Sequence, residues 1–304
     1  MQFNVLSSAA NQNQRMAWYW KPLREVALSW SFIAGDVSST IIPATLFLTA
    51  AWHSQDGSPG SWFQAAARGL IYFWLYIYTF CLSNQIAGLE EDRINKPHRP
   101  IVRGVVSLKG ARRRWLWSML AFTMVGWLFG VWPWTLLWQF VTILHNFAGC
   151  AKHWFGKNII MAFGIVSELG AAWEIVRPMT PLAWLWVLTI AVAIFVLVPT
   201  QDLRDMEGDR QTGRRTIPLA IGEQSARIVL AVCFAFMPLI IHFWLIMPLG
   251  LTTGALVCDA LLAGMSLLIS WRLLFLRWPR ADHHTYLLFT YWYCMLLFSA
   301  IVVM

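Results

Sequence analysis

The sequence predicts an all-α fold: a polytopic membrane protein with about nine transmembrane helices. Hydrophobic residues make up 58% of its 304 residues and charged residues only 12%, about half the charged share of a soluble globular domain. Apolar runs of roughly 18 to 25 residues recur along the chain, and a bilayer core about 30 Å thick needs about 20 helical residues to cross. A soluble helical protein of this size would not repeat such runs so often.

The apolar runs divide the chain into successive spans joined by short or charged connections. Pro133 and Pro248 mark two of the shortest connections as breaks, because proline disrupts the interior of a helix. The predicted spans are 26–51, 66–87, 114–131, 134–151, 158–176, 182–200, 226–247, 251–273 and 284–304.

The basic residues indicate how these spans are oriented. If the spans alternate and the N-terminus is cytoplasmic, only Arg68 and Arg177 of the 23 Lys and Arg residues fall on the other side. Cytoplasmic loops of membrane proteins are enriched in Lys and Arg. We therefore expect an integral membrane protein with the N-terminus and both long charged loops in the cytoplasm and the C-terminus on the opposite side.

The rest of the composition limits architecture and partners. We expect one integral-membrane domain over 1–304, beginning with a polar segment, 1–24, that lacks the features of a secretory signal. The five cysteines are scattered without a C-x-x-C, which indicates small buried side chains rather than disulfides or a thiolate metal site. The net charge of +8 is explained by topology and by a possible anionic substrate. The lipid bilayer is an expected partner, whereas nucleic acid and an obligate protein partner are not.

The first long loop, 84–114, opens with a cluster of oxygen-bearing side chains. If the preceding span stays helical past the membrane surface, Asn84 and Asp92 lie on one face about two turns apart, and Glu91 shares that face. An amide oxygen and carboxylates at this spacing are suitable ligands for a hard cation such as Mg²⁺.

The second long loop, 201–226, carries three carboxylates at helical spacing. Asp202, Asp205 and Asp209 fall at i, i+3 and i+7, again on one helical face. Their mutual repulsion is larger near a membrane, where screening is poorer, and a divalent cation would remove it. Two such clusters suggest metal ions that bridge an anion between them.

Basic residues surround both clusters and would suit the phosphates of that anion. Arg forms bidentate contacts with phosphate and Lys acts as a point charge, so carboxylates, metal and cations together predict a diphosphate site. Topogenic signals and solvated, ion-paired loops are the alternative explanations of these charges. The basic residues concerned are Arg93, Lys96, Arg99, Arg103, Lys109, Lys152, Lys157, Arg204, Arg210, Arg214 and Arg215.

These residues resemble the motifs of the UbiA superfamily of membrane prenyltransferases and their terpene-cyclase relatives. The family's first motif, roughly N-D-x-x-D-x-x-x-D, corresponds to NQIAGLEED over 84–92, followed by RINKPHRP. Its second motif, D-x-x-D-x-x-x-D, is intact over 202–209 within DLRDMEGDRQTGRRTIP. The resemblance covers nearly the whole chain, and the paired motifs are specific.

The resemblance implies a helical bundle around a central cavity, in which two Mg²⁺ ions bind an isoprenyl diphosphate and ionise its allylic C–O bond. The implied metal and catalytic residues are Asn84, Asp92, Asp202, Asp205 and Asp209. The residues assigned to the substrate are Arg93, Lys96, Arg99, Lys152, Lys157, Arg204, Glu91 and Asn146.

Departures from the first motif point to one branch of the family. Gln85 and Gly88 stand where prenyltransferases that use an acceptor commonly carry Asp, and this form resembles the UbiA-type terpene cyclases. The segments 36–43 and 152–158 also resemble that branch. We therefore predict a cyclase acting on a linear C15 or C20 prenyl diphosphate. Intermolecular transfer to an aromatic or other lipophilic acceptor is the close alternative, and a non-catalytic binder or transporter of anionic lipid is a more distant one.

Polar and aromatic residues within the spans complete the prediction. Ionisable groups in a membrane usually face a cavity or each other, so Asp36, Asn146 and Glu168 are candidates for the cavity. Aromatic faces stabilise cations, but most of the 20 Trp residues are expected at membrane interfaces or in packing. This expected group includes Trp115, Trp117, Trp127, Trp132, Trp134, Trp138, Trp184 and Trp186.

Overall fold

The helices begin where capping side chains favour helix initiation. The computed structural model describes residues 23–55 and 58–304, and this part contains helices and no strand. Ser58, Thr180 and Thr252 each precede a helix and accept a hydrogen bond from the backbone N–H three residues later, which satisfies a donor that the helix leaves free. The helices are Leu23–Ile33, α2 (Ile41–His53), α3 (Pro59–Ala87), α4 (Leu89–Asn95), α5 (Leu108–Leu128), α6 (Trp132–Asn146), α7 (Trp154–Glu174), α8 (Pro181–Leu197), α9 (Asp202–Gln211), α10 (Ile217–Ile221), α11 (Glu223–Ile241), α12 (Thr253–Phe275) and α13 (Pro279–Val303).

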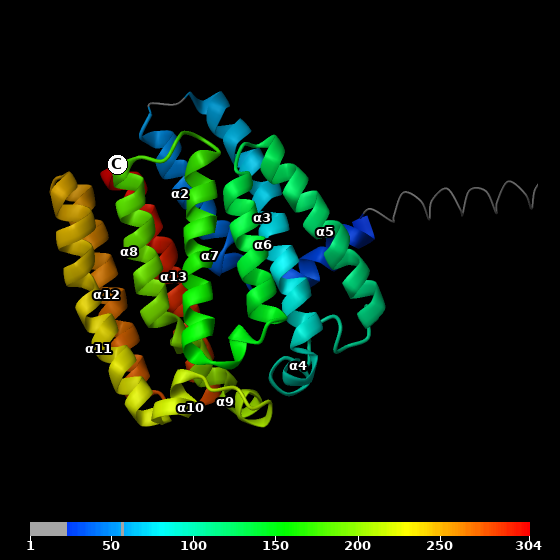
Figure 1. Cartoon of the computed structure of the whole chain (residues 1–304). Helices are drawn as coiled ribbons and strands as arrows, with labels where there is room; N and C mark the ends of the chain where they lie inside the picture. Colours follow the sequence, from blue (N-terminus) through cyan, green and yellow to red (C-terminus); the bar gives the residue numbers. More distant parts are fainter. Residues whose placement is uncertain (1–22, 56–57) are drawn as a thin grey trace, which may run out of the picture.

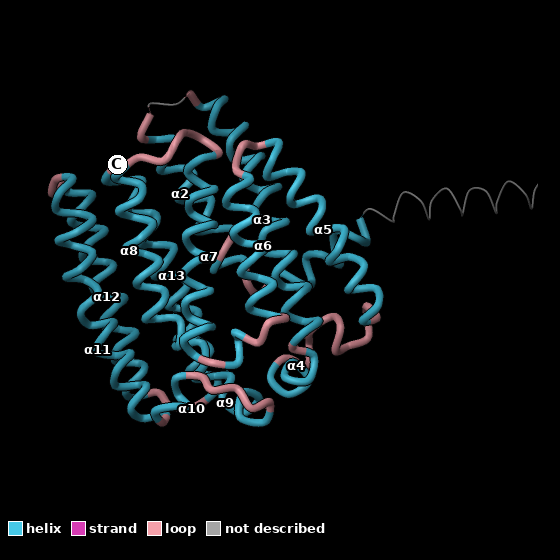
Figure 2. The backbone as a smooth tube through the Cα atoms, in the orientation of Figure 1, coloured by secondary structure: helices cyan, strands magenta, loops and turns pink. Residues whose placement is uncertain are grey.

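The long helices form a bundle in which neighbours in sequence are mostly neighbours in space. α6 packs on α7, α7 on α8, and α11 on α12, which packs on α13 (Figure 1). α2 contacts both α3 and α13, so the two ends of the described chain meet in the bundle. The short helices α4, α9 and α10 gather at one end, and the C-terminus lies at the other (Figures 1 and 2). The motif-bearing segments and the C-terminus are thus at opposite ends of the bundle.

Several helices are suited to a bilayer, but the predicted number of nine spans is not confirmed. Among the described residues, one bent pair of helices, Leu23–Ile33 with Val37–His53, also passes the test of length and apolarity when taken as one span. α5, α6 and α7 do not meet it, and α6 has only 15 residues. The helical stretches that pass singly are Pro59–Ala87, Pro181–Gln211, Glu223–Leu249, Thr253–Phe275 and Pro279–Val303.

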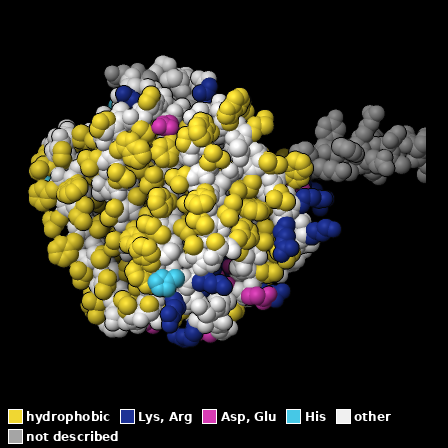
Figure 3. Space-filling model, viewed as in Figure 1, with side chains coloured by type: hydrophobic (Ala, Val, Ile, Leu, Met, Phe, Trp, Pro, Cys, Tyr) yellow, Lys and Arg dark blue, Asp and Glu magenta, His cyan; other side chains and the backbone are white. Residues whose placement is uncertain are grey.

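The outer surface is apolar over the body of the bundle. Figure 3 shows hydrophobic side chains across most of the visible face, with Lys and Arg gathered toward the end that carries α9 and toward one side. Trp117 and Trp127 of α5 are 68% and 70% exposed. So much exposed apolar surface is unfavourable in water and favourable against lipid tails. The chain is therefore an integral membrane protein, whereas its orientation in the membrane stays a prediction.

Two predicted helical stretches are broken, and polar residues or glycine explain both breaks. The first predicted span, 26–51, bends by 64° around Asp36. There the Ser39 and Thr40 hydroxyls donate to the Asp36 carbonyl at 3.0 and 2.6 Å, which competes with regular helix. The helix that contains the second predicted span, 66–87, does not continue to Asp92. This helix, α3, ends at Ala87, and Gly88 separates it from α4. Glycine is a poor helix former.

The two long segments predicted as loops are largely helical. The first, 84–114, contains the end of α3, all of α4 and the start of α5. The second, 201–226, contains α9 and α10 and the start of α11. The predicted helical spacing of the carboxylates therefore continues as true helix in α9 but is interrupted between α3 and α4.

We predict that Gly126→Ala lowers stability by about 1–3 kcal/mol, because it overpacks a fixed contact. A Cβ at Gly126 of α5 would lie 2.1 Å from Oγ1 and 2.8 Å from Cβ of Thr135 on α6. The Thr135 Cβ cannot rotate away, so the helices must separate. Thermal unfolding in detergent measures the effect. Gly264→Ala in α12 is the control, since its Cβ would meet nothing within 4 Å, and an equal effect of both would contradict the packing argument.

Candidate active site

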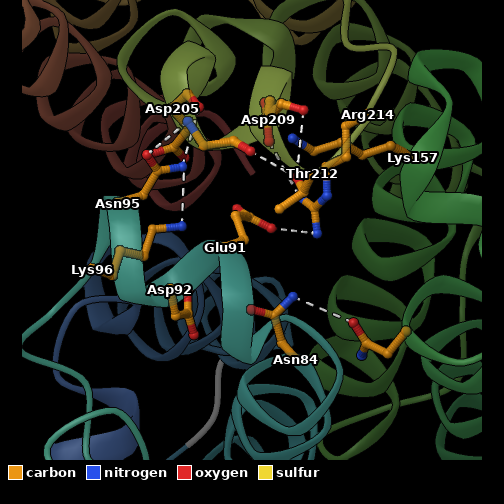
Figure 4. A network of polar contacts seen from close by, with 12 residues as sticks. Asn84, Glu91, Asp92, Asn95, Lys96, Lys157, Asp205, Asp209, Thr212 and Arg214 are labelled. Carbon is orange, nitrogen blue, oxygen red and sulfur yellow. Dashed lines mark hydrogen bonds and ion pairs between the residues drawn. The ribbon is translucent and has the colours of Figure 1, made fainter.

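The two predicted carboxylate clusters face each other across α4 and α9 (Figure 4). Asn95, at the end of α4, holds the two helices together: its Nδ2 donates to the Asp205 carbonyl at 3.1 Å, and its Oδ1 accepts from the Gly208 backbone N–H at 3.2 Å. A Cβ at Gly208 would lie 2.3 Å from Asn95 Nδ2. Glycine at this position therefore permits the close approach of α9 to α4.

Arg99 joins the two ends of the first motif despite the helix break between them. Its Nη1 donates to both carboxylate oxygens of Asp92, at 2.9 and 2.7 Å, and to Asn84 Oδ1 at 3.0 Å. Asp92 is only 2% exposed. Burial raises the pKa of the Asp92 carboxyl above its ordinary value, and the Arg99 guanidinium opposes this rise. Asn84 and Asp92 were predicted on one helical face about two turns apart; they are instead joined through Arg99 across the helix break.

Arg214 connects the first motif to the second. Its Nη2 lies 2.7 Å from Glu91 Oε2, and its Nη1 lies 3.5 Å from Asp209 Oδ1 (Figure 4). Lys96 makes a second connection, with its Nζ 3.5 Å from Asp205 Oδ2. A cation between two carboxylates reduces their repulsion, so these contacts allow both clusters to occupy one small volume.

Lys157, from the first turn of α7, forms an ion pair with Asp202 of α9. Asp202 is fully buried and Lys157 is 7% exposed. Within the described part of the chain, Asp202 Oδ2 and both Asp209 carboxylate oxygens have no hydrogen-bond partner. Buried oxygens without partners are unusual and mark places where a ligand can bind.

The other predicted substrate residues, Arg93, Asn146, Arg204 and Lys152, lie in different surroundings. Arg93 does not join the cluster, because it pairs with Glu90 on the exposed side of α4. Asn146 does join it and accepts from Asn84 Nδ2 at 3.3 Å. Arg204 lies over the Tyr286 ring, with 4.1 Å from its Cζ to the ring centroid. Lys152 lines a small cavity of about 220 Å³ beside Asn84, Glu91, Asn146 and Arg214.

A larger polar cavity of about 630 Å³ lies beside the α4–α9 contact. Its lining includes Lys96, Arg99, Arg204, Asp205 and Asp36. Most of these groups are cations that can donate to phosphate oxygens, and Asp205 adds carboxylate oxygens. The cavity therefore has the charge expected of a site for an anion and a metal.

An apolar cavity of about 140 Å³ lies inside the bundle and shares Asp36 with the polar cavity. Tyr286, which carries the Arg204 guanidinium on one face, also lines it. Asp36 and Tyr286 thus mark the place where the two cavities adjoin. The aromatic residues lining the apolar cavity are Tyr76, Phe80, Trp138, Tyr286, Phe289 and Tyr293.

Sequence reasoning did not identify these aromatic residues as a cavity lining. Trp138, expected at a membrane interface or in packing, is a packing residue in the middle of α6, stacked on Tyr76 at 4.2 Å between ring centroids. Its indole N–H donates to the Tyr76 carbonyl at 3.0 Å. The lining of the cavity by Trp138, Tyr76 and Tyr293 depends on how the helices pack, which the local sequence does not show. Asp36 and Glu168 do line this cavity, as predicted.

The donor set suits Mg²⁺ that is bound together with a phosphate. In the described residues, no group of three His, Cys, Asp or Glu side chains is placed to hold a metal ion alone. Mg²⁺ is usually held by one or two carboxylates, waters and substrate phosphates rather than by a closed protein cage. The buried oxygens of Asp202 and Asp209 without hydrogen-bond partners, and the carboxylate of Asp205 in the lining of the polar cavity, fit that arrangement.

Comparison with a protein-family model agrees with this geometry. The model of the UbiA prenyltransferase family matches residues 40–295. The chain belongs to this family. The predicted membership is therefore confirmed, and the match includes both carboxylate motifs.

Curated relatives in the UbiA family include terpene synthases. The chain is 42% identical to the somaliensene A/B synthase of Streptomyces somaliensis, over 97% of this chain and 99% of that protein. It is 35% identical to the diterpene cyclase eriG of Hericium erinaceus, over 90% and 87%, and 34% identical to the polyprenyl transferase eriF of the same fungus, over 90% and 93%. The predicted resemblance to the terpene-cyclase branch is confirmed, with a transferase also similar.

Solved UbiA structures show the same fold. A UbiA homologue from Archaeoglobus fulgidus bound to GPP and Mg²⁺ superposes with a TM-score of 0.62, over 91% of this chain and 100% of that one, at 15% identity. A structure of a digeranylgeranylglyceryl phosphate synthase superposes with a TM-score of 0.61, over 92% and 98%. The predicted helical UbiA fold is thus confirmed.

We predict that Lys157→Met destabilises this UbiA-family protein by about 3–5 kcal/mol, because it leaves a buried carboxylate unpaired. The double variant Lys157→Met with Asp202→Asn should recover much of the lost stability, because the second substitution removes the unpaired negative charge of Asp202. Unfolding in detergent by heat or denaturant measures both variants. Arg93→Gln is the control, because its exposed pair with Glu90 contributes only about 0–1 kcal/mol. Equal stabilities of the single and double variants would rule out a buried charge pair.

Proposed function

We propose that this protein is a Mg²⁺-dependent terpene cyclase that ionises a linear C15 or C20 isoprenyl diphosphate in the membrane and cyclises the chain. The observation that carries the proposal is that the two cavities share Asp36 in their linings, and that Tyr286 of the apolar cavity lies against Arg204 of the polar cavity. One cavity is lined by cations and by the motif carboxylate Asp205, and the other is lined by aromatic rings. A molecule with a charged head and a hydrocarbon tail matches that sequence of surroundings.

The polar cavity supplies the groups that a diphosphate requires. Lys96, Arg99 and Arg204 are partly buried there and carry hydrogen-bond donors. Hydrogen bonds from such donors become stronger as negative charge develops on the departing oxygen. Two Mg²⁺ ions, which the motif oxygens described above would hold, would neutralise further charge on the leaving diphosphate. Lys152 and Lys157 remain candidates for additional phosphate contacts.

The apolar cavity supplies what a carbocation requires. The rings of Tyr76, Trp138 and Phe289 line this cavity, and an aromatic ring attracts a nearby cation more strongly in the absence of water. The same rings exclude water, which would otherwise capture the cation before ring closure. Cyclisation uses the substrate's own double bond as nucleophile, so it needs no second substrate.

Cyclisation is preferred to transfer on the sequence of the first motif and on the curated relatives. Gln85 and Gly88 replace the Asp residues common in enzymes that use an acceptor, and Gln85 lines the polar cavity. Of the curated relatives, one is named a somaliensene A/B synthase and another a diterpene cyclase. The similarity to a polyprenyl transferase favours intermolecular transfer to a lipophilic acceptor as the second candidate.

We also propose the cytoplasmic placement of α4 and α9.

We predict that the purified protein, given Mg²⁺ and a C15 or C20 prenyl diphosphate without acceptor, releases diphosphate and forms a cyclic terpene. Gas chromatography–mass spectrometry of the extract identifies the product and the preferred chain length. EDTA should abolish the reaction and excess Mg²⁺ should restore it. If diphosphate release required an added aromatic acceptor, the transferase candidate would replace the cyclase.

We predict that Asp205→Asn lowers diphosphate release by about 10²-fold or more, because it removes an anionic oxygen facing the polar cavity. Glu207→Gln on the same helix is the matched control. Glu207 is exposed and pairs with Arg210 at 3.8 Å, so its loss should leave the rate within about twofold and stability within about 0.5 kcal/mol. Steady-state rates at saturating Mg²⁺ decide the comparison. Equal rates for Asp205→Asn and the wild type would contradict the proposed metal role.

A further inference from the structure

Glu168 is a carboxyl group inside the apolar cavity. It belongs to the second half of α7, is 2% exposed, and lines the cavity among Tyr76, Trp138 and Tyr293. Its Oε1 has no hydrogen-bond partner among the described residues. A polar oxygen buried without a partner is costly, so its presence in this lining requires an explanation.

Glu168 differs in this respect from the other buried acidic residues of the described part. Each of the others lies within ion-pair distance of a Lys or Arg, whereas no such partner is found for Glu168 in residues 23–55 and 58–304. The paired residues are Glu91 with Arg214, Asp92 with Arg99, Asp202 with Lys157, Asp209 with Arg214, and Asp282 with Arg227. Buried acids without a cation inside a membrane protein usually mark function.

The position of Glu168 places it away from the diphosphate end. It follows Lys157 by 11 residues on α7, which is about 16 Å at 1.5 Å per helical residue. Asp36 is the other carboxyl of the apolar cavity, but it adjoins the polar cavity and accepts from the Cys81 thiol at 3.3 Å. Glu168 therefore faces the hydrocarbon part of a bound substrate rather than its phosphates or metal.

We propose that Glu168 stabilises positive charge on the hydrocarbon chain far from the diphosphate and thereby determines which carbocation accumulates before the product forms. A neutral hydrocarbon offers a carboxyl group neither a hydrogen bond nor a charge. A carbocation offers a full charge, and a carboxylate close to it favours that charge strongly at low dielectric. The inference rests on the proposed function in that it requires a prenyl cation in this cavity.

The test compares two inert analogues of a prenyl diphosphate. One carries a permanently charged sulfonium centre in place of a distal branched carbon, and the other is its neutral hydrocarbon isostere. Isothermal titration calorimetry with purified protein and Mg²⁺ gives the ratio of the two affinities. We expect the wild type to prefer the sulfonium analogue, and Glu168→Gln, which keeps the shape of the side chain, to reduce that preference about tenfold.

Glu174→Gln is the matched control on the same helix. Glu174 accepts from the Trp134 indole N–H at 2.6 Å and does not line the cavity, and Gln retains an acceptor oxygen, so the preference should stay as in the wild type. An unchanged preference in Glu168→Gln would overturn the inference. If that variant does not fold, Glu168→Asp gives the same test, because it withdraws the charge by one methylene and should also reduce the preference.

Product analysis separates this inference from the proposed function. With a C15 or C20 substrate, Glu168→Gln should give a different distribution of terpene products from that of the wild type. An unchanged distribution would contradict the inference. A wild type that forms no terpene would overturn the proposed cyclase, whereas the sulfonium preference would still decide the role of Glu168.

Discussion

The pairing of buried charges organises the motif-bearing end of the bundle. Asp92, Asp202 and Asp209 are buried. Moving an isolated carboxylate out of water into the protein interior costs several kcal/mol. Each of these three aspartates lies within ion-pair distance of a cation: Arg99, Lys157 and Arg214, respectively. The Lys157–Asp202 pair joins the start of α7 to α9, and Arg214, which also pairs with Glu91, joins the segment after α9 to α4. The polar cavity lies beside these ion pairs, and Arg99 belongs to both.

The same pairing makes the site suitable for a ligand that carries both signs of charge. In the proposed complex, phosphate oxygens would meet Lys96 and Arg99 while Mg²⁺ would meet Asp205 and Asp209. Each protein charge would then keep a partner of opposite sign, so binding would leave no buried charge uncompensated. The apolar cavity adjoins this region at Asp36 and Tyr286. The charged head of the substrate would therefore lie in the polar cavity and its hydrocarbon tail in the apolar cavity.

Local spacing predicted part of the fold and of the site. Asp202, Asp205 and Asp209 share α9 as expected, because a helix brings residues three and four apart onto one face. The same reasoning failed between Asn84 and Asp92, where Gly88 ends the helix. The family fold followed from the motifs, but the count of nine spans depended on apolar length. Charged residues at the start of α5 and the short α6 weaken that criterion.

Contacts between distant segments could not be read from local pattern. Arg93 follows Asp92 in sequence, but adjacent helical residues do not face each other, and Arg93 pairs outward with Glu90. Arg214 reaches Glu91 from far along the chain because α9 approaches α4 closely. That approach depends on Gly208, where any side chain would collide with Asn95. In the sequence, this close approach is marked only by a single glycine within a charged helix. The role of that glycine can be inferred only once the structure shows Asn95 beside it.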